Sequence, residues 1–411
     1  MRSVSVLFVS VLVFVAAVGV APLAAADPAG LSDGSAELST GSPDLAGDPA
    51  QLSTESAEPS TNPALQTDEP NDAFPITLTD ATGTEITLDE RPERVTTTNP
   101  SAAQVMWELD AADQVVGLTQ FAHYLDGAES ETRTNVSSTE QGVSLERVVG
   151  TDPDLVLAPN ATSVETVEAL RETGLTVYHF PQATDFDDVA DKTLTIGQLT
   201  GNEQAAHETN AWVEANVEAV SASTADAENP RLLYPLLGGF AVGGETFIHE
   251  IIVASGAENV ASEEFDGYEV LNDEILYTLD PEVLLVTDQT AGQVMDREPY
   301  SLTTAGEHNR SVQLEVNYIN QAAPRSIVYS TRNLTAQLHP DRYDQSEYVS
   351  RQAIADGEYT PADSDGPDGD EATASDAAET DDADTDVSAP GFGAVAAVLA
   401  LIGGGLLARR R

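Results

Sequence analysis

Residues 201–230 read GNEQAAHETNAWVEANVEAVSASTADAENP, and this stretch decides how the rest of the chain is interpreted. The residues that would form its apolar face recur at spacings of one, three and four, which places them along one side of a helix. They are Ala205, Ala206, Thr209, Trp212, Val213, Val217 and Val220. Such a helix, about 20 residues long, would span roughly 30 Å. Short apolar runs alternate with helical stretches on both sides of it. We therefore interpret the helix as a strut that joins two α/β lobes, with the working site where the lobes face each other.

The segments flanking the strut predict two lobes of similar build. The expected boundaries are residues 74–200 for the first lobe, 201–228 for the linking helix and 229–345 for the second lobe. The first lobe opens with the alternating residues of a β-hairpin, Ile76–Thr79 and Glu85–Leu88. Strands then alternate with helices, which is typical of parallel sheets covered on both faces. We expect Ser101 to cap the first helix and Val312–Tyr318 to form a strand.

Both ends of the chain have the composition of exported and tethered proteins. Residues 1–26 carry Arg2, an apolar run and an Ala-Ala-Ala site, which predicts a signal peptide. Residues 27–73 are too poor in large apolar side chains to offset their ordering entropy, so we expect a disordered linker. An acidic stalk is expected over 346–389, followed by an apolar tail and three arginines over 390–411. Pro390-Gly391-Phe392 ahead of that tail resembles the PGF-type sorting signal of archaeal surface proteins.

The charge balance limits the partners and the habitat. The net charge is −53, from 17 basic against 70 acidic residues, which argues against a nucleic-acid partner. In molar salt the Debye length is about 3 Å, so this self-repulsion is screened, and we infer an extreme halophile. The chain has no cysteine, which excludes disulfides, thiolate metal sites and a cysteine nucleophile.

Several short motifs resemble one family: the substrate-binding proteins of ABC importers for vitamin B12, haem and ferric siderophores. The motifs that carry the resemblance are Arg91-Pro92-Glu93-Arg94-Val95, Asn99-Pro100-Ser101, Ser144-Leu145-Glu146, Asp152-Pro153-Asp154-Leu155, Gly238-Gly239-Phe240 and Ala323-Pro324-Arg325. The resemblance covers about residues 74–345. It implies two Rossmann-like lobes joined by one long helix, with the ligand in the cleft between them.

Ligands of open α/β lobes bind beyond the carboxyl ends of the strands. The residues expected there are Asn99, Ser101, Phe121, His123, Tyr124, Asn160, Gly239, Phe240 and Arg325. The aromatic members suit the broad apolar face of a macrocycle, although each can also be an ordinary packing residue. His123 is a candidate ligand of a chelated metal. Arg325 is a candidate partner of an anionic ligand edge, or else a member of a structural ion pair.

Glu146 and Glu274 each begin a helical turn a few residues before a Pro-acid strand, one in each lobe. In the family that the chain resembles, one surface glutamate from each lobe docks onto arginines of the permease, and these two match those positions. The alternative is a favourable placement of acidic residues at helix N-termini, in a chain that is acidic throughout.

No pattern indicates an enzyme. The six histidines lack metal-ligand spacing, and neither a nucleophile elbow nor a P-loop occurs, so we expect no catalytic residue, resident metal or cofactor. Sequons at Asn135, Asn160, Asn309 and Asn333 allow glycosylation. We expect a monomeric extracellular receptor, tethered by its C-terminus, that delivers a metal chelate to an ABC permease, with a corrinoid ahead of a ferric siderophore. The alternative is an extracellular enzyme or a surface interaction protein on the same fold.

Overall fold

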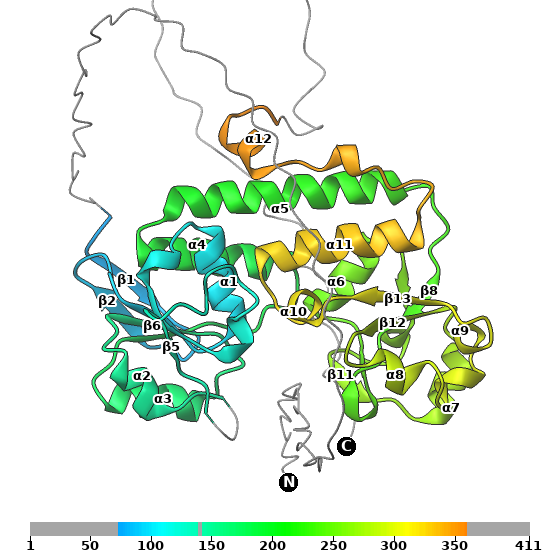
Figure 1. The fold of residues 1–411 in the computed structure, drawn as a ribbon, viewed down its shortest axis with the longest axis horizontal. Coiled ribbons are helices and arrows are strands. Elements are labelled where there is room, and N and C mark those ends of the chain that lie inside the picture. The colour runs from blue at the N-terminus through cyan, green and yellow to red at the C-terminus, as the bar shows by residue number, and fades with distance from the viewer. Residues whose placement is uncertain (1–72, 139–141, 360–411) are drawn as a thin grey trace, which may run out of the picture. The chain divides into compact units, whose positions relative to one another are not determined.

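The computed structural model describes residues 73–138 and 142–359. They form two α/β lobes, which we call the N-lobe and the C-lobe, joined by the long helix α5 (Figure 1). Each lobe contains its own sheet, so the predicted α/β class with parallel sheets is confirmed. The predicted signal peptide, the N-terminal linker up to residue 72, most of the acidic stalk and the C-terminal tail lie outside the described residues.

The N-lobe is built on a five-stranded parallel sheet with the order β5-β4-β3-β6-β7. Its strands are β3 (Val95–Thr97), β4 (Val115–Leu118), β5 (Thr134–Asn135), β6 (Leu155–Ala158) and β7 (Val177–His179). Its helices are α1 (Pro100–Glu108), α2 (Leu145–Gly150), α3 (Val164–Glu172) and α4 (Phe186–Thr200). The antiparallel hairpin β1 (Ile76–Thr79) and β2 (Glu85–Leu88) forms as predicted.

Strand β6 shows why the sheet is covered on both sides. All four of its residues are buried. Leu155 and Leu157 pack into one core cluster with α1 and α4, whereas Val156 and Ala158 pack into another with α2 and α3. Because side chains alternate across a strand, a wholly apolar strand needs a layer of helices on each face.

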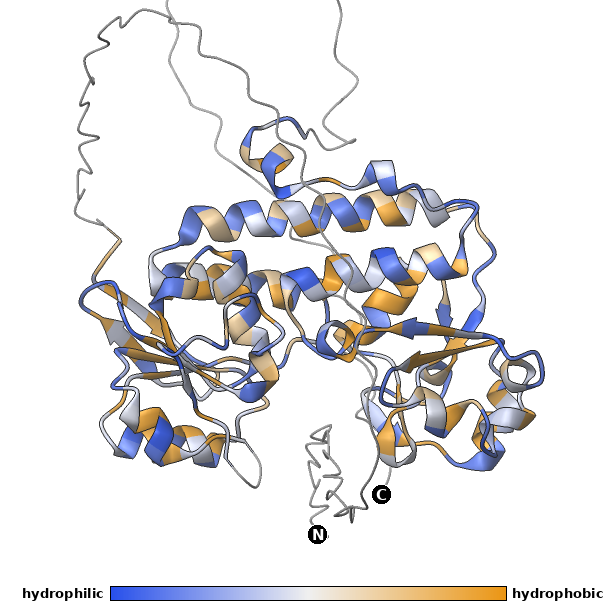
Figure 2. Ribbon diagram, in the orientation of Figure 1, coloured by the Kyte–Doolittle hydropathy of each residue, from blue (hydrophilic) through white to orange (hydrophobic). Residues whose placement is uncertain are grey.

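The C-lobe repeats this arrangement. Its parallel sheet has the order β10-β8-β12-β13, formed by β8 (Arg231–Leu233), β10 (Glu258–Asn259), β12 (Val283–Thr287) and β13 (Ser311–Leu314). Leu284 and Val286 of β12 face one core cluster and Val283 and Leu285 face the other. Figure 2 shows the apolar residues on the strands and inner helix faces of both lobes.

Shorter elements complete the C-lobe. The pair β9 (Phe240–Val242) and β11 (Tyr268–Val270) is antiparallel. The helices are α6 (Phe247–Ala254), α7 (Asp273–Leu279), α8 (Ala291–Val294), α9 (Thr304–Glu307), α10 (Val316–Ile319) and α11 (Pro324–Leu338). The prediction of one strand over Val312–Tyr318 was wrong beyond Leu314, since Glu315 begins a turn into α10.

Helix α5 (Glu203–Thr224) is the predicted strut. Its 22 residues give a length of about 33 Å. Figure 1 shows it passing over both lobes, with α4 and α11 on its inner side. The ring of Trp212 is 2% exposed, so the residue at the centre of the predicted stripe is in the core.

After α11 the chain turns back along α5, and we call residues 342–359 the return segment. The indole Nε1 of Trp212 donates to the carbonyl of Val349 at 3.0 Å. The Asn216 amide donates to the same carbonyl at 2.9 Å and accepts from the backbone N–H of Val349 at 3.2 Å. Helix α12 (Arg351–Ala355) follows and lies on the outer side of α5 (Figure 1). The acidic stalk was expected from residue 346, but the described residues 346–359 include α12, and side chains of α5 hold the backbone of Val349.

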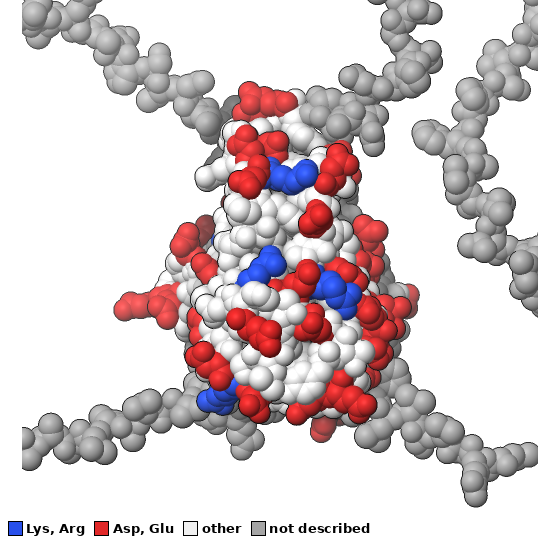
Figure 3. Space-filling model, turned by 90° about the vertical axis from the view of Figure 1, so that its right-hand side faces the viewer, with Lys and Arg blue, Asp and Glu red and all other residues white. Residues whose placement is uncertain are grey.

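Acidic side chains cover the surface. Figure 3, which views the C-lobe end, shows Asp and Glu spread over the whole face, with only a few basic groups among them. Under strong salt screening such a distribution does not destabilise the compact state.

Candidate functional site

The carboxyl edges of the two sheets approach each other, as the sequence predicted for the ligand site. Tyr124 follows β4 of the N-lobe and Tyr318 follows β13 of the C-lobe; their ring centroids lie 5.5 Å apart, edge to face. Tyr234, just after β8, donates from its hydroxyl to Asn320 Oδ1 at 3.2 Å. Loops from several strand ends therefore meet at one place, which is where open α/β folds bind ligands.

Asn99 and Ser101 lie at the first of these strand ends. The Asn99 side chain accepts a hydrogen bond from the backbone N–H of Ser101 at 2.9 Å, and Pro100 occupies the first helical position of α1. The prediction that Ser101 caps this helix was wrong. Proline at the first helical position places the cap immediately before it, and Ser101 is buried inside the first turn.

The loop after β4 presents the aromatic residues of the N-lobe. Phe121 lies in a short 3₁₀ turn, Gln120–Ala122, and is 46% exposed, which is high for a phenyl ring. His123 Nδ1 is 3.0 Å from Glu129 Oε1, so one of the two ring nitrogens is already engaged. The hydroxyl of Tyr124 accepts from Gln104 Nε2 at 2.8 Å. Burial raises the pKa of Tyr124 above its ordinary value, so this phenol stays neutral.

The other predicted contact residues differ in their exposure and backbone conformation. Asn160 is exposed just beyond β6. Gly238 and Gly239 have φ angles of 79° and 83°, a backbone conformation that favours glycine. Phe240 is the first residue of β9 and packs partly against the core of the C-lobe, so it is less available than the loop position expected from the sequence.

Arg325 forms the structural ion pair that the sequence left open. Its guanidinium lies 2.5 Å from Glu108 Oε1, and Arg351 contacts the other carboxylate oxygen of Glu108. Glu108 is 1% exposed and belongs to α1, whereas the arginines begin α11 and α12. One buried carboxylate thus ties the N-lobe to the C-lobe and to the return segment.

Sequence reasoning missed the residues that join the lobes. Gln104 of α1 accepts from the backbone N–H of Ser326 at 3.0 Å and donates to its hydroxyl at 3.1 Å. Lys192, the only lysine, donates to the carbonyl of Ala322, and burial lowers its pKa to about 8. These residues carry no motif, and their partners lie more than a hundred positions away in the chain, so no local signal could have identified them.

Comparison with known proteins now decides the family. A family model described as "Periplasmic binding protein" matches residues 95–318, which span β3 to α10 and include α5. The chain belongs to the periplasmic binding protein family. It is 40% identical, over 82% of its length and 89% of the relative's, to a protein of Halobacterium salinarum (strain ATCC 29341 / DSM 671 / R1) named "Cobalamin-binding protein". It is 24% identical, over 69% of its length and 93% of the relative's, to "Uncharacterized ABC transporter substrate-binding lipoprotein YvrC" of Bacillus subtilis (strain 168).

Solved structures agree on the fold. The periplasmic haem-binding protein RhuT from Roseiflexus sp. RS-1 matches with a TM-score of 0.54 at 23% identity, covering 60% of this chain and 98% of that one. The molybdate-binding protein MolA of Haemophilus influenzae matches with a TM-score of 0.58 at 17% identity, covering 69% and 96%. As a member of the family shown by the sequence matches, the protein is a substrate-binding protein of an ABC importer.

As a periplasmic binding protein, the chain presents one candidate docking glutamate on each lobe. Glu146 lies in the first turn of α2, capped by Ser144, and Glu274 in the first turn of α7, capped by Asn272. Both glutamates are exposed. Figure 1 shows α2 and α7 on the sides of their lobes that face away from α5.

Two searches of the described residues were negative. Over 73–138 and 142–359, the helices are all too short or too polar to span a membrane. Within the same ranges no three His, Asp or Glu side chains gather as a metal site would require. Pro390, Gly391 and Phe392 of the predicted sorting signal lie outside the described residues.

Proposed function

We propose that this binding protein captures a corrinoid, cobalamin or a close relative, outside the cell and delivers it to its permease. The observation that carries the proposal is the 40% identity, over 82% of the chain, to a protein named for cobalamin binding. A match of that length spans most of both lobes. A ferric siderophore is the alternative cargo, and an extracellular enzyme on the same fold remains the alternative from another class.

We place the ligand on the loops where the carboxyl edges of the two sheets meet. The proposed contact residues are Asn99, Ser101, Phe121, His123, Tyr124, Asn160, Gly239, Phe240 and Arg325. Phe121 supports this placement best, because its exposed ring offers an apolar face to a macrocycle. Besides its proposed contact, Arg325 forms the ion pair with Glu108 that holds the start of α11 beside the site.

Titration of the exported chain with cyanocobalamin in molar salt tests the cargo. Phe121→Ala is expected to weaken binding by about tenfold or more, since covering a phenyl ring contributes roughly 1.5–3 kcal/mol. Leu302→Ala is the matched control, because Leu302 is 52% exposed and lies in the 3₁₀ turn Tyr300–Leu302 of the C-lobe, outside the proposed contact residues. Tight binding of ferric hydroxamates with none of cyanocobalamin would reassign the cargo. Turnover of a substrate without binding of any chelate would favour an enzyme.

We propose that Glu146 and Glu274 dock onto basic residues of the permease. The double change Glu146→Gln and Glu274→Gln is expected to abolish cobalamin uptake by cells while leaving cobalamin affinity unchanged. Glu165→Gln is the control, because Glu165 is also an exposed glutamate in the first turn of a helix, α3. Equal uptake by the double variant and the control would refute the docking role.

We also propose that the mature protein is a monomer, held at the outer surface of a halophilic cell by its C-terminus. Support comes from the order of signal peptide, acidic stretch, Pro390-Gly391-Phe392, apolar run and terminal arginines. Mass spectrometry of the C-terminal peptide from native cells distinguishes the two tethering modes. A peptide that ends near Pro390 with a lipid attached indicates sorting and cleavage, whereas an intact Arg411 indicates a retained anchor.

A further inference from the structure

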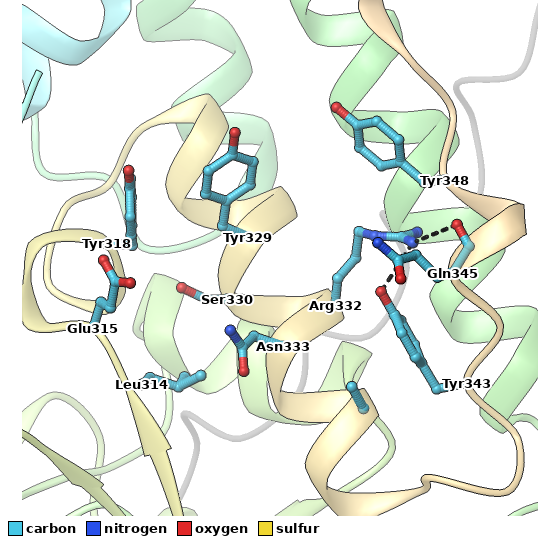
Figure 4. Close-up of a pocket in the computed structure, with 11 residues that line it drawn as sticks. Leu314, Glu315, Tyr318, Tyr329, Ser330, Arg332, Asn333, Tyr343, Gln345 and Tyr348 are labelled. Carbon is cyan, nitrogen blue, oxygen red and sulfur yellow. Dashed lines mark hydrogen bonds between the residues drawn. The ribbon is translucent and has the colours of Figure 1, made fainter. Parts of the chain in front are cut away.

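A cavity of about 360 Å³ crosses the outer face of α11 in the C-lobe. Its walls come from the end of β13, from α10, from α11 and from the return segment, as Figure 4 shows. The volume is that of a small-molecule site. Apart from Tyr318, none of the residues discussed for the corrinoid lines this cavity.

Tyrosines dominate the walls. Tyr318, Tyr329, Tyr343 and Tyr348 all line the cavity. Tyr318 and Tyr329 meet edge to face with their ring centroids 5.1 Å apart. Tyr329 is 43% exposed and Tyr348 is 40% exposed, so their rings present apolar area to whatever enters.

A buried hydroxyl inside the cavity has no partner. Ser330 is 2% exposed, and its Oγ makes no hydrogen bond within the described residues. Figure 4 shows this oxygen directed toward the side of the cavity where Glu315 and Tyr318 stand, with the Asn333 amide on the same side. Buried polar atoms are normally satisfied, so an orphaned hydroxyl at a cavity wall indicates a missing hydrogen-bonding partner.

The charged groups around the cavity are one carboxylate and one guanidinium. Glu315 stands on one side, where its carboxylate can accept hydrogen bonds. Arg332 stands on the other side, stacked between Tyr343 at 5.2 Å and Tyr348 at 4.9 Å, and already donates to the Tyr343 hydroxyl at 3.0 Å. A neutral molecule with an apolar face for the rings and hydroxyl groups for Ser330, Asn333 and Glu315 matches these walls.

We propose that this cavity binds a saccharide ring. One face of the ring lies on Tyr329, and its hydroxyl groups bond to Ser330, Asn333 and Glu315. Asn333 is itself the acceptor of the sequon Asn333-Leu334-Thr335. The saccharide therefore has two sources with the same chemistry: a glycan attached to Asn333 during export, or a glycan of another molecule at the cell surface.

Saturation-transfer NMR on the unglycosylated chain, made in a host without N-glycosylation, tests the site. The probes are glucose, galactose and N-acetylglucosamine at millimolar concentration in molar salt. Tyr329→Ala is expected to weaken binding of the best probe by about tenfold, and Ser330→Ala by about fivefold. Tyr277→Ala is the control, because Tyr277 is 44% exposed on α7, and it should leave binding unchanged. Ser330→Ala alters one oxygen only, so it remains informative if the tyrosine variant folds poorly.

Mass spectrometry of the Asn333 peptide from native cells separates the sources. A glycan on Asn333 that blocks probe binding, compared with the unglycosylated chain, assigns the cavity to the protein's own modification. A bare Asn333, or a glycan that leaves probe binding unchanged, assigns it to an external glycan. No binding of any probe to the unglycosylated chain overturns the proposal, as does equal binding by Tyr329→Ala and Tyr277→Ala. Cobalamin titration of the same sample is independent of these outcomes, so loss of one activity does not mimic loss of the other.

Discussion

Glu108→Gln should destabilise the protein more than any exposed acidic substitution. The carboxylate is 1% exposed and lies between Arg325 and Arg351, on elements from both lobes and the return segment. The pKa of Glu108 is raised, because burial outweighs the two guanidinium groups, which act in the opposite direction and favour the charged form. Glutamine keeps the shape and removes the charge, which leaves two arginines facing a neutral amide.

The expected loss is about 3 kcal/mol. Breaking one partner of a buried ion pair costs about 3–5 kcal/mol, and the arginine side chains, 22% and 36% exposed, can regain some hydration, which favours the lower end. For a folded part of this size the melting temperature should fall by about 5 °C. Because the pair is buried, the loss should persist between moderate and saturating salt.

Thermal and guanidinium unfolding in molar salt measure this effect. Glu263→Gln is the matched control: Glu263 Oε1 lies 2.7 Å from Arg231, but the two side chains are 44% and 33% exposed. Exposed pairs contribute at most about 1 kcal/mol, and strong salt reduces even that. If Glu108→Gln were no more destabilising than Glu263→Gln, the role of Glu108 as the tie between the lobes would be refuted.

Three further predictions concern pH and the return segment. Burial raises the pKa of Asp80, but hydrogen bonds from Thr82, His179 and Arg171 outweigh it and hold the pKa below its ordinary value. Ionised Asp80 therefore stabilises the folded state above about pH 4, and this contribution is lost as the pH falls through the lower pKa of the folded state. Asp80→Asn should make the free energy of unfolding depend less on pH in the acid range. The pKa of Lys192 is about 8 in the folded chain and about 10.4 in the unfolded chain. Between these two pH values the unfolded state therefore binds more protons than the folded state. Wild-type stability should rise across that range, and Lys192→Met should abolish the rise in melts from neutral to alkaline pH. Ending the chain at residue 345 removes the bonds of Val349 to Trp212 and Asn216 and also the contact of Arg351 with Glu108. This predicts a loss of more than about 3 kcal/mol in guanidinium unfolding, whereas ending it at 359 should cost nothing.

The sequence predicted those parts of the fold that local periodicity specifies. The stripe from Ala205 to Val220 identified α5, because a buried helix face repeats every three to four residues. A strand-like alternation misled the prediction farther along the chain, at Val312, Leu314, Val316 and Tyr318. Their period of two continues past the end of β13, but the chain turns into α10 after Leu314. At α1, Pro100 was the better signal for the cap than the serine that follows it.

The contacts between the lobes could not be predicted in the same way. Gln104 meets Ser326 across a separation of 222 residues, and the bond depends on how α1 and α11 pack. Arg325 was predicted as a ligand contact or as a member of an ion pair, and only coordinates distinguish an arginine that awaits a ligand from one that is already paired. The return segment was missed because its polar composition resembles the stalk, whereas its order comes from the partners that α5 supplies.

The buried contacts near α5 limit how the two lobes can move. Gln104 with Ser326, Glu108 with Arg325, and Lys192 with Ala322 all join the N-lobe to the start of α11. Opening the lobes widely would leave these buried groups without partners, at about 1–3 kcal/mol each. The summed free energy of breaking these contacts is well above thermal energy, so the distance between the two lobes should stay nearly constant. Ligand capture then depends on the loops at the carboxyl edges, and differences between free and loaded receptor must reach the permease through small shifts of α2 and α7 rather than through a large closure.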